Sequence, residues 1–114
     1  MNALFICTKN KLRSPTAENV ARAMGVEADS AGLAPEAIQY LQPEQIRWAD
    51  TIFVMESKHK SKLTKKYSKY LKDKKIIVLG ILDNYEYMQP ELIDIFEKIL
   101  PQFLDIQKPK FKIK

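Results

Sequence analysis

The sequence is poor in the residues that form covalent and metal-bound cross-links, with a single cysteine and a single histidine among 114 residues. One cysteine has no partner for an intrachain disulfide. A thiol that takes part in catalysis needs reducing surroundings, which makes the cytoplasm the expected location. One cysteine and one histidine also exclude a zinc site of the Cys/His type, and no carboxylate spacing suggests another metal. The sequence therefore predicts neither a metal site nor another cofactor.

Long hydrophobic runs and internal repeats are also absent. No apolar stretch approaches the length of a membrane-spanning helix, and the N-terminus lacks a charged segment followed by a long apolar region. Hydrophobic residues make up 46% of the chain and charged residues 29%, which is typical of a soluble globular protein. With no repeat and no low-complexity linker, residues 1–114 are expected to form one domain with a modest core.

What is present is an alternation of short apolar runs and amphipathic stretches. The pattern predicts strands over 2–6, 26–30, 51–55 and 76–79, and helices over 15–24, 43–49, 57–72 and 90–100. The last strand reads Ile-Ile-Val-Leu without alternation, as buried parallel strands do. Strands that alternate with helices predict an α/β fold, a four-stranded parallel sheet flanked by helices on both faces, with ligand chemistry at the carboxyl ends of the strands.

The only cysteine lies just after the first apolar run and opens the stretch Cys7-Thr8-Lys9-Asn10-Lys11-Leu12-Arg13-Ser14-Pro15. A cysteine, five residues and an arginine at a strand-to-helix junction are the elements of a thiolate-based phosphatase. The loop amides and the N-terminal end of the helix attract an anion, and Arg13 can close on its oxygens. The same positive field favours Cys7 as the nucleophilic thiolate. Ser14 and Pro15 are expected to begin the helix, as the N-cap and the first helical residue.

This stretch resembles the phosphate-binding loop of the low-molecular-weight protein tyrosine phosphatases, which carry Cys-x-x-Asn-x-x-Arg-Ser-Pro near the N-terminus. Residues 29–32 and 49–56 are similar to later segments of that family. The resemblance implies the phosphotyrosine phosphatase I-like fold. It also implies hydrolysis of phosphotyrosine, in a protein or in a small aryl phosphate, through a phosphocysteine on Cys7. The chain departs from the pattern at Lys9 and Leu12, where better-known members have glycine and a second cysteine.

The resemblance and the chemistry of phosphoryl transfer assign roles to these residues. Cys7 is the nucleophile, and Arg13 offers its planar fork to two phosphate oxygens. By resemblance, Ser14 hydrogen-bonds the Cys7 sulfur and Asn10 holds the shape of the loop. The residues expected to bind phosphate are Thr8, Lys9, Asn10, Lys11, Leu12, Arg13 and Ser14.

The general acid is the part of the site that resembles the family least. The family carries a late Asp-Pro followed by an aromatic residue, whereas this chain has Asp83-Asn84-Tyr85. Asp83 follows a predicted strand, so we expect it at the same edge of the sheet as Cys7. We assign Asp83 as the acid that protonates the leaving group, and Tyr85 as a residue that lines the entrance. The alternative is that Asp83 and Asn84 only form a turn.

Positive charge is concentrated in one segment. Residues 58–75 contain nine lysines and one aspartate, whereas the whole chain carries a net charge of +5. Four apolar and aromatic residues of this segment, from Leu63 to Leu71, fall on one face of a helix. We therefore expect a surface helix whose apolar face packs on the sheet and whose lysines are solvated. His59 is expected at the surface of this helix. A nucleic-acid surface is possible but less favoured.

Two other functions are compatible with the same loop. One is arsenate reduction with external thiols, because the chain has no further cysteine to relay electrons. The other is a catalytically weak module that binds phosphate with the loop and RNA or an acidic partner with the 58–75 segment. The loop and Asp83 together favour a phosphatase that acts on a phosphotyrosine protein or a small aryl phosphate.

Overall fold

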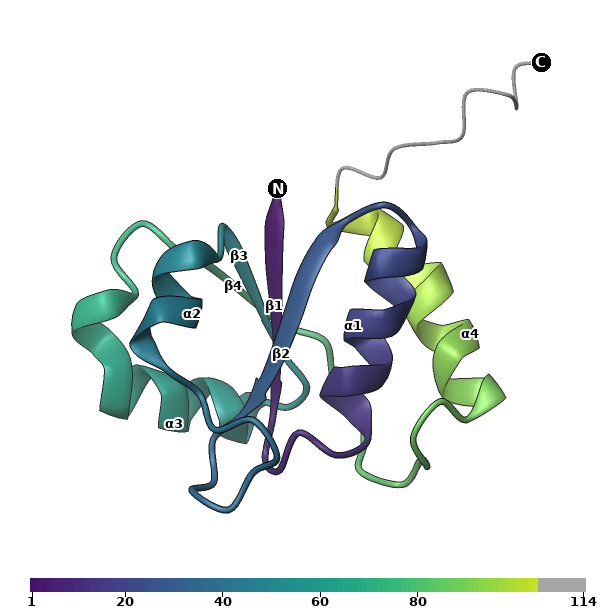
Figure 1. The fold of residues 1–114 in the computed structure, drawn as a ribbon, viewed down its shortest axis with the longest axis horizontal. Coiled ribbons are helices and arrows are strands. Elements are labelled where there is room, and N and C mark those ends of the chain that lie inside the picture. The colour runs from purple at the N-terminus through teal and green to yellow at the C-terminus, as the bar shows by residue number, and fades with distance from the viewer. Residues whose placement is uncertain (105–114) are drawn as a thin grey trace.

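The computed structural model describes residues 1–104, so residues 105–114 of the predicted domain lie outside the described residues. It contains a parallel sheet with the strand order β2-β1-β3-β4 and two helices on each face (Figure 1). The strands are β1 (Asn2–Cys7), β2 (Glu27–Gly32), β3 (Thr51–Val54) and β4 (Lys75–Val78). The helices are α1 (Arg13–Ala23), α2 (Pro43–Trp48), α3 (Ser57–Tyr67) and α4 (Pro90–Ile99), with short 3₁₀ turns at 68–70 and 100–102. The four-stranded α/β architecture predicted from the sequence is confirmed.

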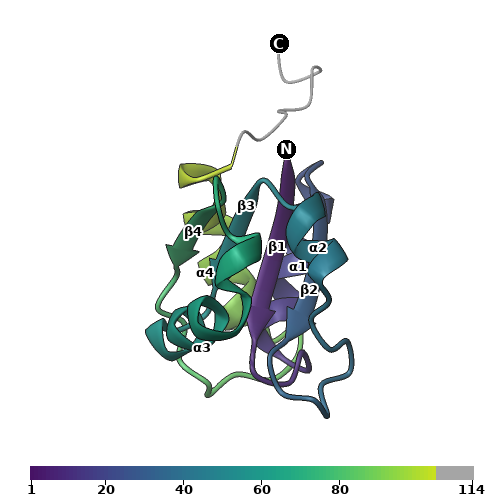
Figure 2. The ribbon, with the colours of Figure 1, turned by 90° about the vertical axis from the view of Figure 1, so that its left-hand side faces the viewer.

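Strand β1 runs through the middle of the sheet, between β2 and β3 (Figure 2). Successive side chains of a strand point to opposite faces, so β1 contributes to two cores. Phe5 and Cys7 belong to the core under α1 and α4, whereas Leu4 and Ile6 belong to the core under α2 and α3. Phe5 stacks on Phe53 of β3 with the ring centroids 5.0 Å apart. Within residues 1–104, none of the helices has the length and apolarity that crossing a membrane requires.

Strand β4 differs from the prediction of a fully buried strand. It is an edge strand with a pairing partner on one side only, and its residues are half-buried or exposed. Val78, in the apolar run, is 40% exposed. A short apolar run indicates a strand of a parallel sheet but does not distinguish an edge from the centre, because that depends on which strands pair.

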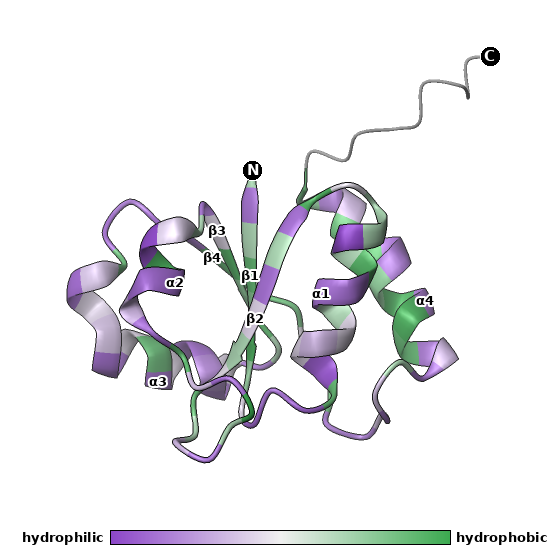
Figure 3. Cartoon of the chain, in the orientation of Figure 1, coloured by the Kyte–Doolittle hydropathy of each residue, from purple (hydrophilic) through white to green (hydrophobic). Residues whose placement is uncertain are grey.

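Helix α3 confirms the interpretation of the lysine-rich segment. Leu63 and Tyr67 are buried in the core under α2 and α3, and the lysines of the helix are exposed. Figure 3 shows that hydrophilic residues dominate this helix. The prediction for His59 is wrong, because its side chain is 1% exposed. His59 precedes Leu63 by four positions and therefore lies on the buried face of the helix.

Candidate active site

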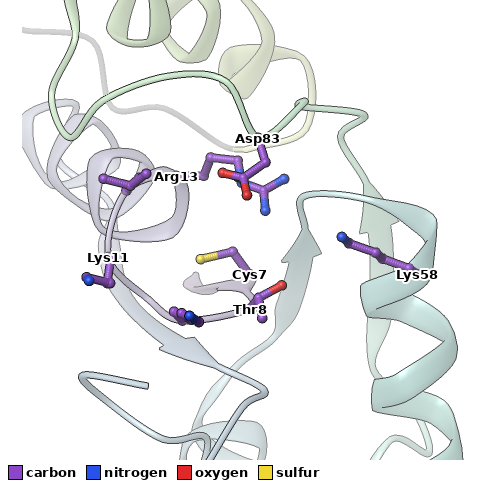
Figure 4. A pocket seen from close by; sticks show the side chains of 8 residues that line it. Cys7, Thr8, Lys11, Arg13, Lys58 and Asp83 are labelled. Atoms are coloured by element: carbon purple, nitrogen blue, oxygen red, sulfur yellow. The ribbon is translucent and has the colours of Figure 1, made fainter. Parts of the chain in front are cut away.

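The carboxyl ends of the strands meet at one edge of the sheet, where the loops after β1, β2 and β4 gather at the bottom of Figure 1. A cavity of about 280 Å³ opens at this edge. It is lined by Cys7, Thr8, Lys9, Lys11, Leu12, Arg13, Lys58 and Asp83 (Figure 4). The fold thus brings the three predicted catalytic residues, Cys7, Arg13 and Asp83, to one cavity.

Segment 33–38 holds the loop that follows β1 in place by hydrogen bonds to the carbonyl oxygens of the loop. The N–H groups of Leu33, Ala34 and Ile38 donate to the carbonyl oxygens of residues 7, 8 and 9 at 3.0, 2.9 and 3.1 Å. In a trans peptide the next N–H points opposite to the carbonyl, so the amides of residues 8–10 point away from segment 33–38. Within residues 1–104, the N–H groups of residues 9–12 donate to no protein acceptor. Unpaired amides at a strand-to-helix turn are the donors that an oxyanion site uses.

Asn10 fixes the conformation of this loop. Its backbone φ of 56° lies in the left-handed region, which asparagine tolerates better than most residues. Its buried side-chain amide donates to Ser14 Oγ and to Ser30 Oγ, both at 2.9 Å. Gly32 of β2 lies against the same loop, and a Cβ at that position would stand 2.7 Å from the Thr8 carbonyl oxygen. The loop therefore depends on a polar clamp at Asn10 and on the absence of a side chain at Gly32.

Ser14 lies beside the sulfur of Cys7 and does not begin the helix as predicted. Helix α1 begins at Arg13, with Leu12 in the N-cap position and no side-chain cap. The Ser14 Oγ is 3.0 Å from Cys7 Sγ and accepts a hydrogen bond from Asn10 Nδ2. Because the oxygen is already an acceptor, its own proton is free to point at the sulfur. Ser14 is therefore positioned to donate a hydrogen bond to the sulfur.

Arg13 is buried and anchored through one nitrogen of its guanidinium. Nη1 donates to Glu56 Oε1 at 2.7 Å and to the Ile81 carbonyl oxygen at 2.8 Å. The hydrogen bond from Arg13 holds the pKa of the Glu56 carboxyl below its usual value, so the anchor stays charged. Nη2 has no acceptor within residues 1–104, and Nε lies 3.6 Å from Asp83 Oδ1. The Nε–Nη2 edge is therefore available to two oxygens of a phosphate group.

Glu56 and His59 are site residues that the sequence analysis did not identify. Glu56 lies two residues after the end of β3, which pairs with β1, so the signal was the position of an acid at the carboxyl end of a central strand. The Glu56 N–H donates to His59 Nδ1 at 3.0 Å, which places the ring proton on Nε2. Nε2 then donates to Thr8 Oγ1 at 2.9 Å. The Thr8 hydroxyl proton remains free to donate to a ligand in the cavity.

Asp83 and Tyr85 occupy different surroundings. Asp83 has 60% of its side chain exposed and lies beside the Arg13 guanidinium, as Figure 4 shows. Tyr85 does not line the cavity as expected and is instead half-buried against the core under α1 and α4. An aromatic ring stabilises the fold more when it is buried than when it is exposed at a cavity entrance. The two-residue spacing between Asp83 and Tyr85 does not show in which direction the Tyr85 ring points.

The burial of His59 predicts a fall in stability as the pH falls. Burial, aided by the charge of Arg13, lowers the pKa of His59 from 6.5 to about 4. Between these values the unfolded chain binds a proton that the folded chain does not bind, so the free energy of unfolding decreases on acidification. We expect a loss of about 2 kcal/mol between pH 7 and pH 5, measured by urea unfolding. His59→Gln has no group that titrates here and should flatten this dependence. An equally steep dependence in the variant would contradict the assignment.

The N-terminal sequence and the fold are both similar to those of known proteins. The family model of low molecular weight phosphotyrosine protein phosphatases matches residues 2–47, and no curated protein matches the chain by sequence. Three solved structures are similar over most of their length. The YwlE arginine phosphatase from Geobacillus stearothermophilus is 21% identical, with a TM-score of 0.70 over 89% of this chain and 91% of that one. A low molecular weight protein tyrosine phosphatase from T. tengcongensis is 26% identical, with a TM-score of 0.69 over 90% and 99%. SP-PTP from Streptococcus pyogenes is 16% identical, with a TM-score of 0.74 over 98% and 97%.

Proposed function

We propose that this chain is a short, divergent member of the low molecular weight phosphotyrosine protein phosphatase family, whose model matches residues 2–47. We further propose that it hydrolyses phosphotyrosine through a phosphocysteine on Cys7. The observation that carries the proposal is the shared cavity of Cys7, Arg13 and Asp83. A nucleophile, a cation for the equatorial oxygens and an acid for the leaving oxygen are what phosphoryl transfer from a monoester requires.

The proposed reaction has two steps. In the first, the Cys7 sulfur attacks phosphorus, a P–S bond forms, the P–O bond to the tyrosine breaks, and the Asp83 carboxyl gives its proton to the departing oxygen. In the second, the Asp83 carboxylate takes a proton from a water molecule whose oxygen attacks phosphorus. The P–S bond then breaks, and orthophosphate and the thiolate are released. Arg13 and the unpaired amides of residues 9–12 bind the equatorial oxygens in both steps.

The charge of the cavity favours an aryl phosphate over phosphoarginine. One of the similar structures is named an arginine phosphatase, so both substrates deserve a test. The guanidinium of phosphoarginine brings a positive charge to the cavity entrance, where Lys9, Lys11 and Lys58 already stand. A phenol ring brings no charge and avoids this repulsion.

The direct test is to incubate the protein with p-nitrophenyl phosphate and with two peptides of the same sequence, one carrying phosphotyrosine and the other phosphoarginine. We expect release of orthophosphate, faster from phosphotyrosine than from phosphoarginine. Rapid quenching should trap one phosphate on the protein, located by mass spectrometry on Cys7, which is the only cysteine. Absence of hydrolysis with all three substrates would refute the proposal, and faster release from phosphoarginine would refute the proposed substrate.

Asp83→Asn tests the general acid. An amide has no proton to give, so the loss should be large when the leaving group needs protonation and small when it does not. We expect kcat/KM, which reports the steps up to departure of the leaving group, to fall about 100-fold with phenyl phosphate and about tenfold or less with p-nitrophenyl phosphate. Asp94→Asn is the matched control, because Asp94 lies on α4 in an ion pair with Lys98. Equal losses with the two substrates would mean that Asp83 does not protonate the leaving oxygen.

A further inference from the structure

The cavity entrance carries more positive charge than one phosphate group requires. Besides Arg13, three lysines line it, Lys9 and Lys11 from the loop and Lys58 from α3. Figure 4 shows Lys11 and Lys58 on opposite sides of Cys7. Asp83 is the one carboxylate on the lining, and it already faces Arg13 at 3.6 Å. A substrate whose only charge is its phosphate leaves part of this positive charge unpaired.

The positive charge continues along α3 away from the cavity. Lys58, Lys62 and Lys65, here called the lysine strip, follow each other at the spacing of helix turns, beside the buried face of the helix. All three are exposed, and α3 contains no acidic residue. In the described part of the chain Lys62 and Lys65 form no ion pair, and Lys58 lies 3.7 Å from Glu56, a carboxylate already bound by Arg13. The strip is therefore free to bind an external anion.

We propose that the lysine strip binds acidic residues of a phosphorylated protein substrate, close to the residue whose phosphate enters the cavity. This rests on the proposed function, because it names the substrate class of the same site. A helix rises about 1.5 Å per residue, so the strip is about 10 Å long. An extended peptide covers that length in about three residues. Acidic side chains within about four positions of the phosphorylated residue therefore reach the strip.

The aromatic residues near the strip favour a protein substrate over nucleic acid. Single-stranded RNA is bound by exposed aromatic rings, on which bases stack, beside a positive groove. Tyr67 of α3 is buried, and Lys66 lies over the ring of Tyr40 at 5.0 Å. Tyr70 is half-buried, with Arg47 and Lys69 over its ring. These rings are already covered, so the strip offers charge without a surface for base stacking.

The test compares two phosphotyrosine peptides that differ only in four flanking positions, which are glutamate in one and glutamine in the other. We expect kcat/KM to be about tenfold higher for the glutamate peptide at low ionic strength. Because the strip is exposed, salt should screen the attraction, and the ratio of the two kcat/KM values should approach one in 0.5 M KCl. A ratio of one at low ionic strength would overturn the proposal.

Charge variants assign the preference to the strip. Lys62→Gln combined with Lys65→Gln should lower the ratio several-fold, whereas Lys98→Gln on α4, across the sheet, should leave it unchanged. An unchanged ratio in the double variant would overturn the proposal. The proposal would also be overturned if the unaltered protein showed a kcat/KM ratio of one for the two peptides and single-stranded RNA inhibited it in a salt-sensitive way. That result would assign the strip to RNA binding. Release of orthophosphate by the unaltered protein from p-nitrophenyl phosphate or from a phosphotyrosine peptide separates the two proposals, since its absence with every substrate refutes the proposed function itself.

Discussion

Cys7→Ser is expected to lower kcat with p-nitrophenyl phosphate by about 10⁴-fold or more, because a serine hydroxyl does not ionise in the pH range where a thiol does. The substitution is close to isosteric, and the side chain is 3% exposed at the end of a buried strand. The hydrogen bond from Ser14 and the donors around the cavity stay in place. The variant should therefore fold and bind orthophosphate while turnover is lost. Initial rates, circular dichroism and calorimetric titration with phosphate measure these three properties.

The single cysteine makes a second, chemical form of this experiment unambiguous. Iodoacetate has one thiol to modify, so loss of activity should parallel the uptake of one carboxymethyl group per chain. Orthophosphate, which is expected in the same cavity, should slow the modification. Ser14→Ala is the matched variant, because it removes the hydroxyl 3.0 Å from the sulfur and leaves the thiol. It should retain part of the activity. A Cys7→Ser variant with more than about one hundredth of the original kcat would rule out a covalent role for the thiol.

The sequence predicted the parts of the site that are close together along the chain. A buried strand, a loop with cysteine and arginine, and a helix occupy residues 2–23 without interruption, so their local pattern sets their arrangement. The position of Asp83 at the same cavity was also predictable, because the carboxyl ends of parallel strands share one edge. The strand order places β4 two strands away from β1, and the segment after β4 spans that distance.

Contacts that depend on side-chain packing were not predictable in the same way. Glu56 anchors Arg13 because β3 pairs with β1, and no local pattern fixes strand order. The buried face of α3 begins at His59, one turn before Leu63. The sequence pattern did not indicate this, because histidine counts as a polar residue. The orientation of Tyr85 depends on the core beneath it. In each case the missing information is a tertiary contact between segments that are far apart in the sequence.

Arg13→Lys is expected to reduce kcat/KM by about 10³-fold, although it conserves the positive charge. The guanidinium serves two partners at once, because Nη1 is fixed by Glu56 and Ile81 while the Nε–Nη2 edge faces the cavity. A lysine has one nitrogen, so its ammonium either pairs with Glu56 or binds phosphate, and it cannot present two donors in one plane. The loss should be seen in kcat as well as in phosphate affinity, since the equatorial oxygens gain charge in the transition state.

Arg22→Lys provides the control for this prediction, because Arg22 lies on the same helix, its side chain is 58% exposed, and it does not line the cavity. Its kcat/KM should stay within about twofold of the original value, since the substitution keeps the positive charge at a position outside the cavity. Thermal unfolding separates the chemical effect of Arg13→Lys from a structural one. If the ammonium pairs with Glu56, the melting temperature stays close to that of the original protein while the activity is lost. If Arg13→Lys retained more than about a tenth of the original kcat/KM, a positive charge alone would suffice at this position. The paired Nε and Nη2 donors of the guanidinium would then play no part in catalysis.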